Sequence, residues 1–129
     1  MEKWRQRIGT RDFKIGICWQ GSATYKGDCG RSFYVDHFEA LGRIPGVRLI
    51  SLHKGDGESQ LRTLPRGMAV EIPGEDFDAG SDAFVDTAAV MMCLDLVITS
   101  DTAIAHLAGA LGVPTWVALQ YVPDWRWLL

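Results

Sequence analysis

Short apolar runs alternate along the chain with segments that carry helical spacing. Five runs are rich in apolar and β-branched residues and lack helical periodicity: residues 13–19, 47–52, 68–72, 94–99 and 115–119. Such runs are typical of strands that helices cover on both faces, as in a parallel sheet. We therefore predict these five segments as strands.

Helical signals lie between the predicted strands. We predict a helix over residues 33–44 with Ser32 as its N-cap, a short helix over 58–64, and a helix over 102–111 that ends before Gly112. A further helix, capped by Asp82 or Asp86, should place these residues on one apolar face: Phe84, Val85, Ala88, Ala89 and Met92. Strands alternating with helices predict an α/β fold, a doubly wound and mostly parallel Rossmann-like sheet of strand order 3-2-1-4-5.

The domain organisation expected from the length is simple. A chain of 129 residues has room for one ordinary domain, which we place at residues 13–129, after a lead-in of residues 1–12. The aromatic and apolar residues 123–129 predict that the chain is a piece of a longer protein, truncated at both ends. A packed apolar tail is the alternative.

Composition excludes several classes of function. The net charge is −3 with no basic run, so we expect no nucleic-acid partner. No apolar stretch approaches the ~20 residues that span a bilayer, and no signal peptide is visible, so a cytoplasmic location is the default. Cys18, Cys29 and Cys93 lack CxxC spacing, so neither disulfides nor a zinc or other metal site is expected. Cys29 is a weak candidate nucleophile, whereas Cys18 and Cys93 are most simply core residues.

The topology predicts where a ligand would bind. In an open parallel sheet, ligands bind outside the carboxyl ends of the strands, where the strand order reverses. Those ends are followed here by residues 21–31, 53–57 and 100–102. In the order 3-2-1-4-5 the first and fourth strands are neighbours, so the first loop and the 100–102 turn should face one another across one crevice.

The turn before the fourth helix carries candidate binding residues. Thr102 and His106 are four residues apart and share a helix face, and free N–H groups at a helix N-terminus favour an anion such as phosphate. Thr102 adds a hydroxyl donor, and Ala103 leaves the approach open. Asp101 would repel phosphate, so it is better suited to accept hydrogen bonds from sugar hydroxyls. Alternatively, Asp101 or Ser100 caps the helix and His106 is structural.

The first loop carries further candidates. Backbone N–H groups and small residues such as Gly21 and Ser22 can cradle phosphate oxygens, and Arg31 can bind one in bidentate fashion. Lys54, just after the second strand, offers another cation. The loop is neither GxGxxG nor a P-loop, which argues against nicotinamide binding and nucleoside-triphosphate hydrolysis. An ordinary βα loop and a solvated lysine are the alternatives.

A family resemblance enters at these residues. Residues 94–116, LDLVITSDTAIAHLAGALGVPTW, resemble the signature of glycosyltransferase family 9, the heptosyltransferase-like enzymes. Residues 15–21, 31–32, 51–55 and 123–127 are similar to the version of this domain at the C-terminus of bacterial tetratricopeptide-repeat proteins. The resemblance covers residues 14–128.

The resemblance implies a GT-B architecture, in which two Rossmann-like domains hold a nucleotide-sugar donor between them. Asp101, Thr102, Ala103 and His106 match the family's donor-contacting turn, while Lys54 and the Gly21 loop lie near the donor diphosphate. Heptosyltransferases often have glycine where Ala103 stands, which leaves the donor base and sugar open. The donor would be a substrate, with neither cofactor nor metal required.

Three hypotheses remain open at this point. The first is the donor-binding half of a glycosyltransferase that transfers a glycosyl group to a hydroxyl, and this half alone should not turn over. The second is a non-catalytic binding or scaffold module that retains the fold, and the third is an unrelated doubly wound domain that binds flavin or another phosphate ligand. Without its N-terminal partner domain, such a half should expose an apolar interdomain face and self-associate.

Overall fold

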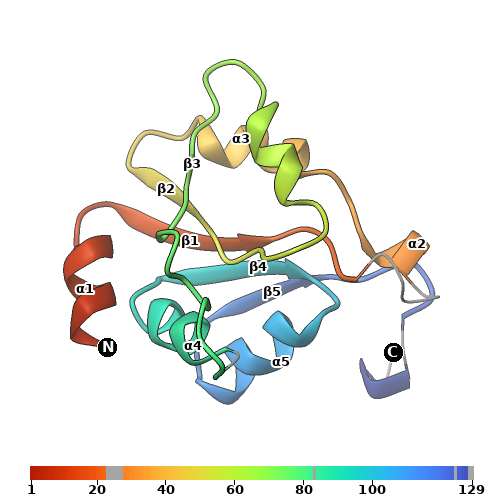
Figure 1. The fold of residues 1–129 in the computed structure, drawn as a ribbon. Coiled ribbons are helices and arrows are strands. Elements are labelled where there is room, and N and C mark those ends of the chain that lie inside the picture. The colour runs from red at the N-terminus through yellow and green to blue at the C-terminus, as the bar shows by residue number, and fades with distance from the viewer. Residues whose placement is uncertain (23–27, 83, 124, 128–129) are drawn as a thin grey trace.

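A five-stranded parallel sheet forms the centre of the computed structural model, which describes residues 1–22, 28–82, 84–123 and 125–127 (Figure 1). The order β3-β2-β1-β4-β5 confirms the predicted doubly wound topology. Ile15 of β1 aligns with Leu49 of β2 on one side and Leu96 of β4 on the other. The strands are β1 (Phe13–Cys18), β2 (Val47–Ser51), β3 (Val70–Glu71), β4 (Leu96–Ser100) and β5 (Thr115–Ala118).

Helical segments lie on both faces of this sheet. In Figure 1, α3 lies on one face, and α1, α4 and α5 lie on the other. None of the helices in the described part of the chain is long and apolar enough to cross a membrane. The helices are α1 (Glu2–Ile8), α2 (Asp28–Arg31), α3 (Glu39–Gly42), α4 (Val85–Met91) and α5 (Ala103–Ala110), with 3₁₀ turns η1 (Val35–Phe38), η2 (Glu58–Arg62) and η3 (Trp125–Trp127).

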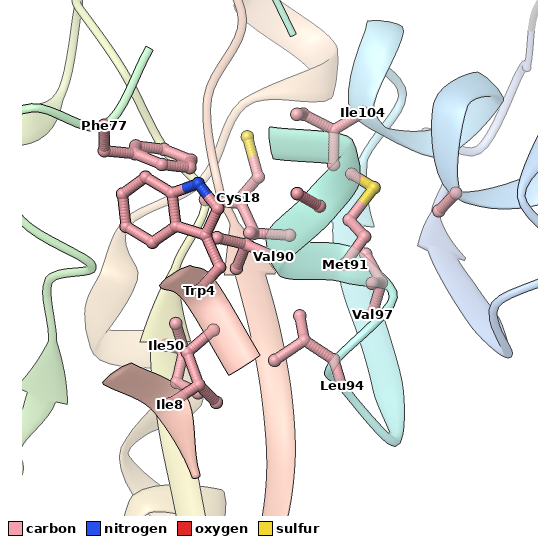
Figure 2. Packing of buried hydrophobic residues seen from close by; sticks show 13 residues of the cluster. Trp4, Ile8, Cys18, Ile50, Phe77, Val90, Met91, Leu94, Val97 and Ile104 are labelled. Carbon is pink, nitrogen blue, oxygen red and sulfur yellow. The ribbon is translucent and has the colours of Figure 1, made fainter. Parts of the chain in front are cut away.

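Two apolar clusters fill the space between the sheet and its helices. The larger cluster joins α1, α4 and α5 to the sheet, and Figure 2 shows Trp4, Val90 and Ile104 within it. The second cluster lies on the α3 face and contains Ile17 and Trp19, both fully buried. Covering both faces explains why the central strands are apolar in sequence without alternating.

Residues 1–12, expected only as a lead-in, contain a helix that belongs to the core. Trp4 and Ile8 of α1 are 2% and 6% exposed. Nη1 of Arg48 donates to the carbonyl oxygens of Ile8 and Arg11 at 2.8 and 3.0 Å, which fixes the end of this segment against β2. Spaced four residues apart, the two apolar residues lie on one face of a helix whose other residues are polar or charged.

Two predicted helices differ from the structure. The segment predicted over residues 33–44 is a 3₁₀ turn followed by the single turn of α3. Ser32 is not its N-cap, because the turn begins at Val35 with Tyr34 as N-cap; the Ser32 hydroxyl accepts a hydrogen bond from the Gly21 N–H at 3.2 Å. This contact ties the start of the first loop to its end.

The predicted apolar face of α4 was also wrong. Phe84 has φ 70° and precedes the helix, which begins at Val85, and the side chains of Phe84, Val85 and Met92 are exposed. The buried side of α4 instead carries Thr87, Ala89, Val90 and Met91. Neither Asp82 nor Asp86 caps α4 through its side chain. The side chain of Asp78 accepts hydrogen bonds from the first-turn N–H groups of Asp86 and Thr87 at 3.2 and 3.4 Å, and this contact orients the helix.

Candidate functional site

A cavity of about 290 Å³ opens at the carboxyl ends of β1, β2 and β4. This is the point between β1 and β4 at which the strand order reverses, where doubly wound sheets bind ligands. The strand ends and the starts of α4 and α5 supply its walls. The lining residues are Cys18, Gln20, Gly21, Ser22, Arg31, Leu52, His53, Lys54, Asp78, Phe84, Thr87, Thr102, Ala103 and Ile104.

The structure brings six of the eight predicted residues together at this cavity. The six are contributed by three different strand ends, as the topology predicts, and are Gly21, Ser22, Arg31, Lys54, Thr102 and Ala103. Asp101 and His106 do not line the cavity. Of the first loop, Thr24, Lys26 and Gly27 lie outside the described residues.

Arg31 links the first loop to the turn before α5. Its Nη1 donates a hydrogen bond to the Asp101 carbonyl oxygen at 3.0 Å. A Cβ atom at position 21 would come within 2.1 Å of Arg31 Nη2, so the absence of a side chain at Gly21 leaves room for the guanidinium. The arginine therefore adds positive charge to the cavity wall from a fixed position.

The N-terminus of α5 forms the opposite wall. Thr102 is the N-cap in extended conformation (φ −136°, ψ 177°), and its own side chain makes no capping hydrogen bond. The first N–H groups of a helix have no intrahelical acceptor, and the helix dipole adds partial positive charge there. Thr102 Oγ1 lies 3.4 Å from Thr99 Oγ1 and also borders the cavity. This wall presents hydrogen-bond donors suited to an anion.

Lys54 supplies a second cation to the cavity. Its Nζ donates to the carbonyl oxygen of Phe77 at 2.5 Å. This bond connects the end of β2 to the segment that leads into α4. Lys54 and Arg31 thus border one cavity together with the α5 N-terminus, a combination that favours a ligand with more than one negative charge.

Asp101, in the turn between β4 and α5, is buried. The residue is 9% exposed, and its Oδ1 atom has no hydrogen-bond partner among the described residues. The same holds for the Oγ atom of Ser100. The alternative in which Asp101 or Ser100 caps α5 is therefore wrong. Burying a carboxylate oxygen without a hydrogen-bond donor costs folding free energy. The turn therefore holds an acceptor that a bound ligand could satisfy.

His106 lies on the exposed side of α5, against the end of the chain. Its ring stacks on Trp127, with centroids 5.5 Å apart at 14°. Arg126 connects it to Asp101, because Arg126 Nη1 is 3.4 Å from His106 Nε2 and Nη2 is 3.9 Å from Asp101 Oδ1. Asp101 and His106 are thus brought together by η3 rather than by the cavity.

Sequence reasoning missed several residues of the cavity. His53 was noted only as part of a strand end, and Cys18 was taken as core. The Sγ atom of Cys18 lies 3.4 Å from Nδ1 of His53, whose ring stacks on Trp19 at 4.3 Å and 18°. Burial raises the pKa of the Cys18 thiol and lowers the pKa of His53. A polar side chain directly after an apolar strand was the signal available for His53.

Phe84, Asp78 and Thr87 complete the missed set. Phe84 has the left-handed conformation that non-glycine residues adopt rarely, and its half-exposed ring borders the cavity. Asp78 accepts a hydrogen bond from the Thr87 hydroxyl. Within the described residues, no three His, Cys, Asp or Glu side chains converge as a metal site would require.

Known structures share this architecture. An Escherichia coli ADP-heptose LPS heptosyltransferase II matches 90% of the chain with a TM-score of 0.64 at 16% identity. E. coli heptosyltransferase WaaC with ADP-2-deoxy-2-fluoro heptose matches 94% with a TM-score of 0.64, also at 16% identity. The fold resembles that of the heptosyltransferases. At these identities the likeness concerns the fold, and the chain spans 36% and 37% of the two enzymes' lengths.

Sequence comparison adds one relative. Protein FlbA of Caulobacter vibrioides is 34% identical over 105 residues, which make up 78% of this chain and 17% of FlbA. No family model matches the chain. The heptosyltransferase-like fold expected from residues 94–116 is therefore confirmed by structure, whereas the likeness to tetratricopeptide-repeat proteins stays a prediction.

Proposed function

We propose that this chain binds a nucleotide diphosphate sugar and forms the donor-binding half of a GT-B glycosyltransferase. The observation that carries the proposal is the cavity at the switch point, where the uncapped α5 N-terminus, Arg31 and Lys54 border one space. Diphosphate is the ligand with charge and acceptor oxygens suited to all three. No resident cofactor is needed, because the nucleotide sugar is the substrate.

The orientation of the donor follows from the charges around the cavity. The diphosphate would lie against Thr102 and Ala103, with Lys54 and Arg31 neutralising its charge. Asp101 would accept hydrogen bonds from hydroxyl groups of the donor sugar through the oxygen that has no partner among the described residues. Arg126 lies beside Asp101 and Trp127 beside His106. For the sugar to reach Asp101, these two side chains of η3 must either contact the sugar or move away.

ADP and its sugar conjugates are the donors to test first. Two of the similar solved structures are described as heptosyltransferase WaaC with ADP-2-deoxy-2-fluoro heptose and with ADP. The fold shared with these structures supports trying adenine before other bases. Glycosyl transfer to a hydroxyl would need a second domain, since the chain spans 36–38% of the heptosyltransferases it matches.

Calorimetric titration with ADP, UDP, GDP and CDP tests the proposal. We expect saturable binding of one nucleotide and weaker binding after Thr102→Ala, which removes a hydroxyl at the cavity. Thr115→Ala is the matched control, because Thr115 Oγ1 bonds the Val113 carbonyl at the opposite end of the sheet. Equal affinity in both variants would contradict the placement of the ligand.

The second candidate function is a scaffold module that keeps the fold without a donor. It predicts that no nucleotide binds to the chain alone, and that none binds when the chain is joined to an N-terminal GT-B domain. The Asp101 Oδ1 atom argues against it: among the described residues it has no hydrogen-bond partner and only a long ion pair with Arg126, and a site that has lost its ligand gains nothing from such a buried acceptor. Location in the cytoplasm, attachment to tetratricopeptide repeats and a role for self-association remain parts of the proposal.

A further inference from the structure

A thiol–imidazole pair lies in the floor of the cavity, and the proposed function does not use it. Cys18 is the last residue of β1, and His53 lies two residues beyond the end of β2. Parallel pairing of these strands brings Cys18 Sγ within 3.4 Å of His53 Nδ1. The residues are 3% and 4% exposed, and both line the cavity.

The hydrogen bonds of His53 determine which nitrogen accepts a proton. Nε2 contacts the carbonyl oxygen of Asp56, which can only accept, so Nε2 carries the hydrogen. In a neutral imidazole this leaves Nδ1 with its lone pair directed at Cys18 Sγ. Stacking on Trp19 holds the ring in this orientation. The thiol also lies 3.8 Å from the Gln20 carbonyl oxygen, so His53 Nδ1, at 3.4 Å, is the nearer of these two acceptors and the only basic one.

Both partners are neutral near pH 7. Burial raises the pKa of the Cys18 thiol, and burial lowers the pKa of His53. The nearby charge of Arg31 acts on the Cys18 pKa in the opposite direction from burial. Deprotonation of the thiol therefore needs a base in contact with it, and His53 Nδ1 is in that position.

The cavity gives reagents a route to the thiol. Figure 2 shows the sulfur of Cys18 at the end of the apolar cluster where Ile104 lies. Ile104 and Leu52 belong both to that cluster and to the cavity wall, so the cavity ends where the core begins. A small uncharged molecule that enters beside Thr102 approaches the sulfur from the cavity, and the 3% exposure of Cys18 limits this access to small reagents.

We propose that Cys18 is a modification site for small, soft electrophiles, that His53 takes up its proton, and that modification and ligand binding exclude one another. With iodoacetamide, a bond forms between Sγ and the methylene carbon, the carbon–iodine bond breaks, and iodide leaves with the bonding electrons. The thiol proton passes to His53 Nδ1 and then to solvent. The exclusion rests on the proposed function, whereas the reactivity does not.

Labelling rates test the reactivity. The chain carrying Cys29→Ser is treated with iodoacetamide, and peptide mass spectrometry follows Cys18 and Cys93 in the same sample. Cys93 is the internal control, since it is half-buried, donates to the Ala89 carbonyl at 3.3 Å and does not line the cavity. We expect Cys18 to react at least about tenfold faster, because a positioned base typically supplies about 10²–10⁴-fold and burial of the thiol offsets part of that gain. A Cys18 rate equal to or below that of Cys93 overturns the proposal.

The role of the imidazole needs a separate variant. His53→Gln removes the base, so Cys18 should lose about tenfold in rate or more while Cys93 is unchanged. His53→Asn is the second variant, should the first unfold, and urea denaturation checks both. An unchanged Cys18 rate in a folded variant overturns the assignment of His53.

Nucleotide protection separates this inference from the proposed function. Fast labelling that saturating ADP slows, together with loss of ADP binding in the carbamidomethylated protein, supports both. Fast labelling that no nucleotide affects, with no calorimetric binding, retains the modification site and rejects the donor site. Nucleotide binding without fast Cys18 labelling retains the donor site and rejects the modification site.

Discussion

The indole N–H of Trp4 donates a hydrogen bond to Oδ1 of Asp86 at 2.8 Å, which joins the first helix to the first turn of α4. The two residues are 82 positions apart. The Trp4 ring also meets Phe77 edge-on, with centroids 5.8 Å apart. Because Phe77 accepts the hydrogen bond from Lys54, this N-terminal helix supports one wall of the cavity.

Trp4 should therefore be required for stability. Trp4→Ala removes a 2%-exposed ring, and we expect a loss of about 3–5 kcal/mol in the free energy of unfolding. Trp4→Phe keeps most of the apolar contact but leaves Asp86 without this donor, so the loss should be about 1–3 kcal/mol. Urea denaturation measures both. Trp116→Phe, at a 63%-exposed position, is the control and should stay within about 0.5 kcal/mol.

Gly16 should not tolerate a side chain. A Cβ atom there would lie 2.5 Å from Leu94 Cδ1 and 2.7 Å from Leu52 Cδ1, and both leucines are buried. Gly16→Ala should lower the free energy of unfolding by about 1–3 kcal/mol through overpacking. Gly109→Ala is the matched control, because Gly109 lies within α5 with open space around it and should gain roughly 0.5–1 kcal/mol. A loss at Gly109 equal to that at Gly16 would contradict this account.

The sheet was predictable from sequence because its signal is local. Buried parallel strands such as β1 and β4 are dense apolar runs, and their order follows from general rules of chain connection. The start of α4 was not predictable, since it depends on Asp78 and Asp86, whose hydrogen bonds form only in the folded chain. Trp4 was missed for the same reason: its partners lie far away in sequence.

The candidate site divides in a similar way. Residues that directly follow strands, such as Lys54 and Thr102, were found because topology alone places strand ends together. His106 was expected beside Thr102 from helical spacing, but one helical turn carries it past the cavity to Trp127. The Cys18–His53 contact depends on the pairing of β1 with β2, and an apolar strand gives no local sign of it.

Stability should fall as the pH drops from 7 to 5, and His53 should account for part of this. Burial places the pKa of His53 in the folded state below its unfolded value of about 6.5. Between these values the unfolded chain binds a proton that the folded chain does not, so stability rises with pH, by at most about 1.4 kcal/mol per unit for one group. His53→Gln should flatten the dependence between pH 5 and 7, as measured by urea denaturation.

His37→Gln is the control for this pH series, because His37 is exposed on η1. It should leave the slope unchanged. A slope that is identical in His53→Gln and the parent chain would show that protonation of His53 costs nothing in the folded state.

The open edge of β5 should pair with β5 of a second copy of the chain. β5 pairs with β4 alone among the described strands, and residues 111–123 contain no charged side chain. Trp116 is 63% exposed, and Tyr121 and Val122 are exposed beyond the strand. Charged side chains normally protect such edges, and a two-fold antiparallel pair would satisfy both backbones. This edge is a second surface on which we expect self-association, beside the interdomain face predicted from the sequence.

Light scattering after gel filtration, over rising protein concentration, checks the association. Trp116→Lys should shift the chain towards monomer. Ile72→Lys is the control, since Ile72 is 64% exposed just after β3, at the opposite edge of the sheet. A parent chain that stays monomeric at millimolar concentration, or equal effects of both substitutions, would count against the β5 edge.

Asp101 and Asp78 should respond differently to the same substitution. Asp78→Asn disrupts a carboxylate that accepts from the Thr87 hydroxyl and from N–H groups at the start of α4, so we expect a loss of about 1–3 kcal/mol. Asp101→Asn removes a buried charge whose Oδ1 has no hydrogen-bond partner among the described residues, and whose ion pair with Arg126 is long at 3.9 Å. Its stability should therefore be unchanged or higher by up to about 1 kcal/mol.

Asp101→Asn should weaken ligand binding even though it leaves the stability of the fold unchanged or raises it. If its free oxygen accepts from sugar hydroxyls, Asp101→Asn should weaken binding of an ADP-sugar by about tenfold, which corresponds to the loss of one charge-assisted hydrogen bond, while ADP binding changes little. Calorimetry on the parent chain and the variant, with ADP and an ADP-sugar as paired ligands, measures the difference. Equal weakening for both ligands would place Asp101 at the diphosphate or at the fold of the turn instead of at the sugar.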